Sequence, residues 1–147
     1  RFDLEDTTSD GGKDVSAMIH RVVFGSIERF IGVITEHFAG AFPAWLAPVQ
    51  VKILPVTDRA LDYAKELSDA LDGQGFRVEV DDRNEKIGKK IREATLEKIP
   101  YMLVVGDRDM EAGTVSVRTR TGEDLGAMSL ADFSALLRDV VDSKARK

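Results

Sequence analysis

The feature that most limits the possible folds is a short, wholly apolar run, Tyr101–Val105, which stands between Pro100 and Gly106. A strand without a polar side is typical of the centre of a sheet that is covered on both faces. Two stretches with helical spacing precede the run, and strands that alternate with helices require right-handed crossovers and a parallel arrangement. The run and its neighbours therefore predict an α/β domain.

Seven elements are predicted after residue 47, in the order strand, helix, strand, helix, strand, strand, helix. They are Val49–Leu54, a helix from Thr57 or Asp58 to Gly73, Phe76–Val80, Asn84–Ile99, Tyr101–Val105, Thr114–Arg120, and a helix that Ser129 caps with Asp132. The short link between the last two strands allows an antiparallel pair. We therefore expect residues 47–147 to form a mixed sheet with helices on both faces.

Residues 1–46 have a different pattern. It predicts an edge strand at Arg1–Leu4, a polar turn at 5–14, a second strand at Ala17–Phe24 and a helix over Ser26–His37. Two antiparallel strands and one helix are too few to bury a core. We therefore expect residues 1–46 to belong to a larger domain, and the first residue, Arg1, suggests a fragment.

Composition excludes several kinds of site. The chain has no cysteine, which excludes disulfides, thiolate nucleophiles and Cys-ligated metals, and its two histidines, His20 and His37, cannot close a tetrahedral site alone. Acids outnumber bases by 26 to 21, and the net charge of −5 excludes a uniformly basic coat for nucleic acid. Neither a signal peptide nor a membrane span is expected.

A local basic patch is nevertheless present. Residues Arg83–Lys98 hold six Lys or Arg against three Glu, so this segment can orient a polyanion on an acidic body. Lys89 and Lys90 are the candidate phosphate contacts. The alternative is a solvated helix face with pairs such as Glu85–Lys89.

Spacing within this segment indicates a reading surface. On a helix, Asn84, Gly88 and Arg92 form one stripe, and a glycine between an amide and a guanidinium lets a planar group approach closely. The glycine can equally serve close packing of the helix on the sheet.

Further polar residues have both a functional and an ordinary interpretation. Arg118 and Arg120 share a strand face with Ser116, and this face is turned either to a ligand or to solvent. Asp107 and Asp109 follow the central strand, where they form either part of a ligand site or an ordinary turn. In the first region, Arg29 lies in the first turn of a helix, where the dipole disfavours a cation. His20 is a core histidine or a metal ligand.

Several motifs taken together resemble the threonyl-tRNA synthetases of bacterial type. Met18–Phe30 is similar to the third signature motif of class II synthetases, and Ala44–Gln50 to the link into the anticodon-binding domain. The likeness continues through the core of that domain, in Asp82–Arg92, Ile99–Asp107 and Gly113–Arg118. It implies the end of a class II catalytic domain over 1–46 and an anticodon-binding domain over 47–147.

The resemblance implies roles for individual residues. Arg29 matches the catalytic arginine that lies against ATP, and Ser26 lies in the neighbouring substrate pocket. His20 matches one of three zinc ligands, of which the other two, a Cys and a His, are absent from this chain. The anticodon-reading positions match Asn84, Arg92, Arg118 and Asp109, the last standing where the family has a glutamate.

The family charges tRNA(Thr) with threonine in two ATP-dependent steps. The resemblance therefore implies ATP with Mg, zinc, threonine and tRNA(Thr) as cofactors and partners of the full-length enzyme, which is a cytoplasmic homodimer. The fragment alone is expected to be catalytically incomplete and to retain no cofactor. The alternatives are a non-catalytic RNA-binding module of the same fold and a flavodoxin-like domain, although Pro55–Asp58 offers the latter no phosphate loop.

Overall fold

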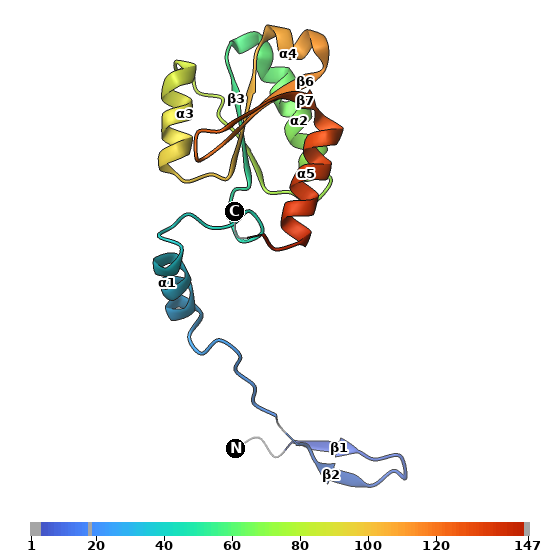
Figure 1. Cartoon of the computed structure of the whole chain (residues 1–147). Helices are drawn as coiled ribbons and strands as arrows, with labels where there is room; N and C mark the ends of the chain where they lie inside the picture. Colours follow the sequence, from blue (N-terminus) through green and yellow to red (C-terminus); the bar gives the residue numbers. More distant parts are fainter. Residues whose placement is uncertain (1–3, 18, 146–147) are drawn as a thin grey trace. The chain divides into compact units, whose positions relative to one another are not determined.

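The computed structural model describes residues 4–17 and 19–145, and the chain divides into two compact units, residues 1–33 and 34–147 (Figure 1). The first unit holds a two-stranded antiparallel sheet and the second a five-stranded sheet. Helix α1 (Ile27–His37) runs across the division between them. Within the described ranges, no helix is both long enough and apolar enough to cross a membrane.

The second unit is built on a mixed sheet with the strand order β4-β3-β5-β6-β7. Strands β3 (Val51–Pro55), β4 (Val78–Val80) and β5 (Tyr101–Val105) are parallel to one another. Strands β6 (Thr114–Thr119) and β7 (Asp124–Ser129) extend the sheet in antiparallel fashion. The apolar run is thus the central strand, and the predicted fold class is confirmed.

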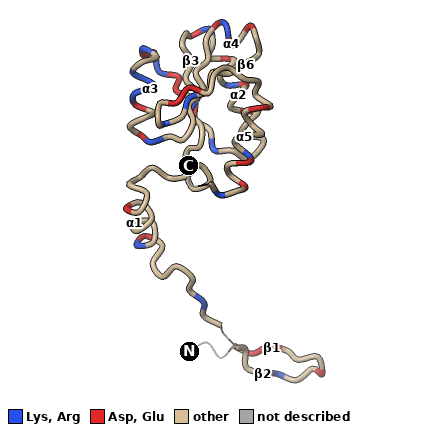
Figure 2. The backbone as a smooth tube through the Cα atoms, in the orientation of Figure 1, with Lys and Arg blue, Asp and Glu red and all other residues tan. Residues whose placement is uncertain are grey.

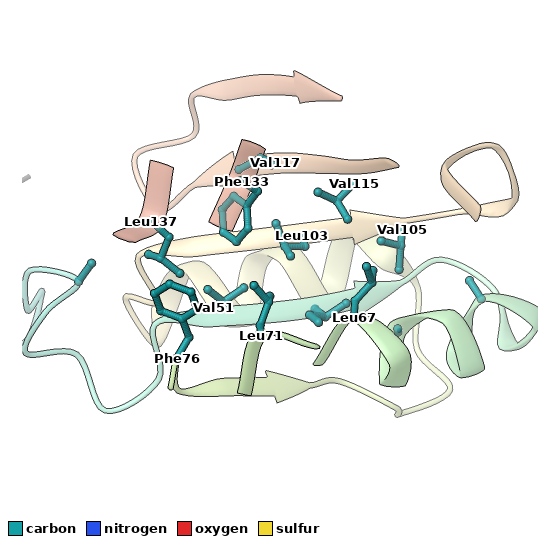
Figure 3. Close-up of a cluster of buried hydrophobic side chains, with 14 residues drawn as sticks. Val51, Leu67, Leu71, Phe76, Leu103, Val105, Val115, Val117, Phe133 and Leu137 are labelled. Atoms are coloured by element: carbon teal, nitrogen blue, oxygen red, sulfur yellow. The ribbon is translucent and has the colours of Figure 1, made fainter. Parts of the chain in front are cut away.

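Helices cover the two faces of this sheet unequally. Helices α2 (Leu61–Asp72) and α5 (Leu130–Asp142) cover one face along most of its width. The core between them and the sheet contains Val51, Leu67, Leu71, Phe76, Leu103, Val105, Val115, Val117, Phe133 and Leu137 (Figure 3). On the other face, α3 (Ile87–Leu96) packs Ala94 against Leu54 and Met102. Helix α3 therefore covers this second face over β3 and β5 and does not extend over β6 and β7.

The connector before β3 is fixed by side-chain hydrogen bonds. The buried Gln50 donates from Nε2 to the Ala44 carbonyl (2.8 Å) and accepts from the Arg77 amide (2.9 Å). The Arg77 Nε donates to the Ala47 carbonyl (2.8 Å). These bonds join the connector to the segment that enters β4.

The strands predicted in the first unit are wrong in position. The sheet is formed by β1 (Glu5–Thr7) and β2 (Lys13–Val15), so the predicted turn itself supplies both strands. Residues 19–24 are irregular, and their apolar side chains are exposed, with Ile19 at 89%. A strand needs a neighbouring strand, and no described strand lies beside residues 19–24. The strand expected at Arg1–Leu4 falls mostly outside the described residues.

Two predictions in the second unit are also wrong. Helix α3 begins at Ile87 rather than Asn84, and Asp107 and Asp109 lie in a short helix, α4 (Asp107–Ala112), which corrects the interpretation of these residues as a turn. Strand β7 was not predicted. Its residues include no β-branched side chain, and Gly126 has a φ of +82° next to a bulge in the pairing with β6. The neighbouring strand, rather than the local sequence, makes this segment extended.

Candidate nucleic-acid interface

On the second sheet face, α3 covers Lys52 of β3 and Met102 of β5, and the open part presents Arg118 of β6 and Asp124 of β7. The pairing places Lys52 of β3 beside Met102 of β5, Met102 beside Arg118 of β6, and Arg118 beside Asp124 of β7. The same face of β6 presents Ser116 beside Val104. The expectation that Ser116 and Arg118 share a face is therefore confirmed, and this face is the one on which α3 packs.

Arg120 does not share this arrangement, because it follows the end of β6. Its Nη1 donates to the carbonyls of Phe42 (2.5 Å) and Lys98 (3.4 Å). Partial burial lowers the pKa of this guanidinium, although the nearby Tyr101 opposes the shift. Arg120 therefore binds the connector through the Phe42 carbonyl, and it is not part of the open face.

Two candidate residues on this face are held by neighbours. The Arg118 Nη2 lies 3.3 Å from the Asp124 carboxylate, and both side chains remain partly exposed. In α4, Asp109 accepts from the Gly106 amide (3.0 Å) and from the Ser116 hydroxyl (2.9 Å). Asp109 thus caps α4 and orients Ser116, next to Arg118 along β6. The two residues lie on adjacent parts of one surface.

Asn84 does not lie on a helical stripe with Gly88 and Arg92, because it precedes the first residue of α3. It belongs to the exposed loop that joins β4 to α3, at the carboxyl end of the parallel strands. Gly88 has no heavy atom within 4 Å of a built Cβ, so it does not serve tight packing on the sheet. Arg92 is exposed on α3, and no ion pair involves it among the described residues. The helical conformation that sequence spacing predicts for Asn84 is therefore wrong, and its part in a reading surface stays a prediction.

Lys and Arg gather along α3 (Figure 2), but most have partners within the domain. Lys89 pairs with Glu85 at 2.5 Å, as predicted from the helical spacing, and the Lys98 Nζ donates to the Ala39 carbonyl. The interaction with Glu85 raises the pKa of Lys89. Over the described ranges, Lys86 and Arg92 are the cations of this segment whose side chains form no hydrogen bond or ion pair.

Lys90 is not a phosphate contact. Its side chain is only 4% exposed, and the ammonium donates to the carbonyls of Asp81 (2.9 Å) and Pro55 (3.2 Å). These carbonyls end β4 and β3, so Lys90 joins α3 to both strand ends. The sequence could not distinguish Lys90 from Lys89, because both are lysines on one helix, and only the packing of α3 decides which one faces the sheet.

The loop that holds Asn84 has a second anchor. The Arg83 Nε and Nη2 donate to the two oxygens of the buried Asp81, at 2.8 and 2.6 Å, and Nη2 also lies 2.7 Å from Glu93 of α3. These hydrogen bonds lower the pKa of Asp81, although burial opposes the shift, and they raise the pKa of Arg83. A cavity of about 30 Å³ lies beside this loop, bordered by Asn84 and Lys90.

Lys52 supports the same face from below α3. It is 4% exposed and pairs with Glu97 (2.6 Å) and Glu79 (3.2 Å). Burial opposes the charge on the ammonium, but the hydrogen bonds and charges of both glutamates outweigh burial and raise its pKa. Lys52 therefore joins the end of α3 to β3 and β4, and it is not available to a ligand.

The candidate residues of the first unit lie at the start of α1. Ser26 caps this helix, since its Oγ accepts from the Arg29 amide (3.3 Å), and it donates to Glu28 (2.7 Å). The predicted cap is thus confirmed, and the Arg29 side chain is exposed. His20 is also exposed in this chain, and no group of three potential metal ligands occurs among the described residues. These residues therefore do not by themselves fit a zinc ion.

An α/β domain with a partly open, charged sheet face is suited to bind an extended polar ligand. The sequence model of the anticodon binding domain matches residues 50–140, and the chain belongs to this family. It is 61% identical over 144 residues to a threonine–tRNA ligase of Desulforamulus reducens and 58% identical to that of Clostridium novyi. In each case the match covers 98% of this chain but only 23% of the relative, so the chain spans about a quarter of the curated relatives.

A solved structure supports the same relationship. The RNA binding domain of threonyl-tRNA synthetase from Cryptosporidium parvum Iowa II is 34% identical to this chain, with a TM-score of 0.74. The alignment covers 82% of this chain and 30% of that one. The fold and the sequence therefore lead to the same family.

Proposed function

We propose that this chain is part of a threonine–tRNA ligase and that its second unit reads the anticodon of tRNA(Thr). The observation that carries the proposal is the 61% identity to a threonine–tRNA ligase over 98% of the chain. The match therefore includes most of residues 1–46, which an isolated RNA-binding module has no need to keep. This extent favours the ligase over the non-catalytic module of the same fold.

The proposed reading surface is the open sheet face together with the loop before α3. Threonine codons begin with A-C, so the anticodons of tRNA(Thr) end in G-U. Guanine offers two acceptors, O6 and N7, to a two-pronged arginine, for which Arg92 and Arg118 are the candidates. Uracil offers both a donor and acceptors, which suit the amide of Asn84. Bases splayed from a single-stranded loop reach such side chains, as is typical of RNA recognition.

Asp109 has a more limited part in this proposal. Both of its carboxylate oxygens already accept hydrogen bonds, from the Gly106 amide and the Ser116 hydroxyl. Each oxygen keeps one lone pair, so Asp109 can accept from a base amino or imino group while it holds α4 and β6 together. We therefore propose that Asp109 contacts a base, and that its hydrogen bonds to Gly106 and Ser116 hold the carboxylate in position for this contact.

Residues 1–46, which include the first unit and the connector before β3, are assigned to the end of the catalytic domain. The exposed apolar side chains between residues 15 and 33 support this assignment, because such a surface calls for a partner: Val15, Ile19, Val22, Val23, Phe24, Ile27, Ile31 and Val33. Arg29 and Ser26 are assigned to ATP and the substrate pocket. His20 is assigned as one zinc ligand, and the described residues supply no complete set, so no chemical step is derived through zinc.

The activity and the remaining partners belong to the full-length protein in this proposal. They are ATP with Mg, threonine, tRNA(Thr) and a second subunit, in the cytoplasm. The 147-residue chain lacks most of the pocket in which threonine and ATP would react. We therefore expect no ATP–pyrophosphate exchange from the chain alone, and exchange above background would contradict the assignment of this chain as a partial enzyme.

Binding of RNA hairpins by the chain tests the proposed function directly. One hairpin presents a threonine anticodon in its loop, and two others carry a changed G or a changed U. We expect the Kd to rise about fivefold or more for each changed base, since a good base contact contributes about 1–3 kcal/mol. Equal affinity for the three hairpins would refute anticodon reading by this domain.

A further inference from the structure

The loop between β4 and α3 presents Asn84 without holding it directly. The Asn84 side chain is exposed, and no hydrogen bond to Asn84 is found among the described residues. Reading a base through an amide requires donor–acceptor distances of about 2.7–3.2 Å at both groups. An exposed asparagine reaches that accuracy only if its neighbours fix the backbone on which it stands.

Arg83, the residue before Asn84, supplies such a constraint. Its guanidinium forms two hydrogen bonds to the two oxygens of Asp81, and its own amide also donates to Asp81 Oδ1 (3.2 Å). The Asp81 side chain is 1% exposed, so the anchor of this pair is in the domain interior. The same guanidinium also pairs with Glu93, which lies almost two turns after the first residue of α3. Arg83 therefore fixes the loop to both β4 and α3.

The residue after Asn84 is held more weakly. Glu85 donates its amide to the Arg83 carbonyl (2.9 Å) and pairs with Lys89. The side chains of Glu85 and Lys89 are 38% and 50% exposed, so water competes for both partners. The Arg83 side chain is 49% exposed as well, but its partner Asp81 is buried and accepts two hydrogen bonds from the guanidinium. The orientation of the loop thus depends on the Arg83 side more than on the Glu85 side.

We propose that Arg83 is a positioning residue for base recognition: its two-pronged pair with Asp81 and its contact with Glu93 hold Asn84 in the orientation in which Asn84 reads its base. This inference rests on the proposed function. Arg83 is itself an arginine in a basic segment, and the alternative is that it adds only positive charge near the RNA backbone. The two roles differ in outcome, because a general charge affects all RNA sequences alike, whereas a lost orientation affects one base.

Arg83→Gln is the variant that tests the inference, and Lys89→Gln is its matched control. Both changes remove one positive charge from the same segment, but only the first removes the pair with Asp81. Arg83→Lys keeps the charge and loses the two-pronged geometry. Each protein is titrated with the native hairpin, the changed-U hairpin and the changed-G hairpin, and a thermal melt of each confirms that it is folded at the temperature of the titration.

We expect Arg83→Gln and Arg83→Lys to lose most of the preference for U, which is about fivefold or more, and to keep the preference for G. Lys89→Gln is expected to weaken all three hairpins by the same factor. Asn84→Ala is expected to reproduce the selective loss of the U preference. Equal loss of both preferences, or full preference in Arg83→Lys, would overturn the positioning role. Absence of any preference in the wild-type chain would instead refute the proposed function.

Discussion

Lys89 and Lys90 are adjacent lysines in one helix, and we expect their replacement to have opposite kinds of effect. Lys90→Ala removes three methylenes from a side chain that is 4% exposed, at about 0.8 kcal/mol each. It also removes two charged hydrogen bonds, to Asp81 and Pro55, each contributing about 1.5 kcal/mol. In the wild type, burial of the ammonium away from water has a cost in free energy. Lys90→Ala removes this cost, so part of the lost stability is recovered.

The net cost of Lys90→Ala is therefore about 2–4 kcal/mol in the free energy of unfolding. For a domain of this size, the midpoint of thermal unfolding should fall by roughly 8–16 °C. Lys90→Met keeps most of the aliphatic stem, and we expect it to lie between Lys90→Ala and the wild type. Lys89→Ala should melt near the wild-type temperature, because Lys89 forms one exposed pair along the helix.

Circular dichroism melts of the four proteins measure these effects. The salt dependence of hairpin binding gives a second reading, because a buried ammonium releases no counterion from RNA. We expect Lys90→Met to keep the wild-type slope of log Kd against log salt. If Lys90→Ala melted with Lys89→Ala, or if Lys90→Met lowered the slope by about one unit, the structural role of Lys90 would be refuted.

Three further predictions concern the reading face, pH and the core. Arg118→Ala should cost about 1–3 kcal/mol of hairpin binding and relax discrimination at one base, measured by titration; an unchanged Kd would exclude the contact. The pKa of Asp81 is lower in the folded than in the unfolded chain, so on acidification the unfolded chain binds the proton first. The free energy of unfolding therefore decreases as the pH falls from 3.8 through the folded pKa. Urea unfolding followed from about pH 5 down to about pH 2 should show this loss in the wild type and less of it in Arg83→Gln. Phe133→Ala should cost about 3–5 kcal/mol, since the buried ring packs edge-on against Tyr101, and a shift below about 1 kcal/mol in urea would contradict this packing.

Local pattern was sufficient for the fold class of the second unit, although not for α4 and β7. The apolar run at Tyr101–Val105 identified the central strand because a strand in a sheet that is covered on both faces is apolar at every position. The caps of α1 and α5, Ser26 and Ser129, were readable because a cap is a contact over three residues of sequence. The family relationship was also visible in the sequence, because several motifs occur in order over nearly the whole chain.

What the sequence could not provide depends on contacts between distant residues. Strand β7 exists because β6 offers it a ladder, and residues 19–24 stay irregular because no described strand lies alongside. Helical spacing predicts Asn84 on a helix, whereas Asn84 lies in a loop that Arg83 ties to Glu93 of α3 as well as to the neighbouring Asp81. The choice between Lys89 and Lys90 was decided by which side of α3 meets the sheet. Sequence periodicity reports the burial of a whole face, but tertiary packing decides which single charged side chain is enclosed and which remains available to RNA.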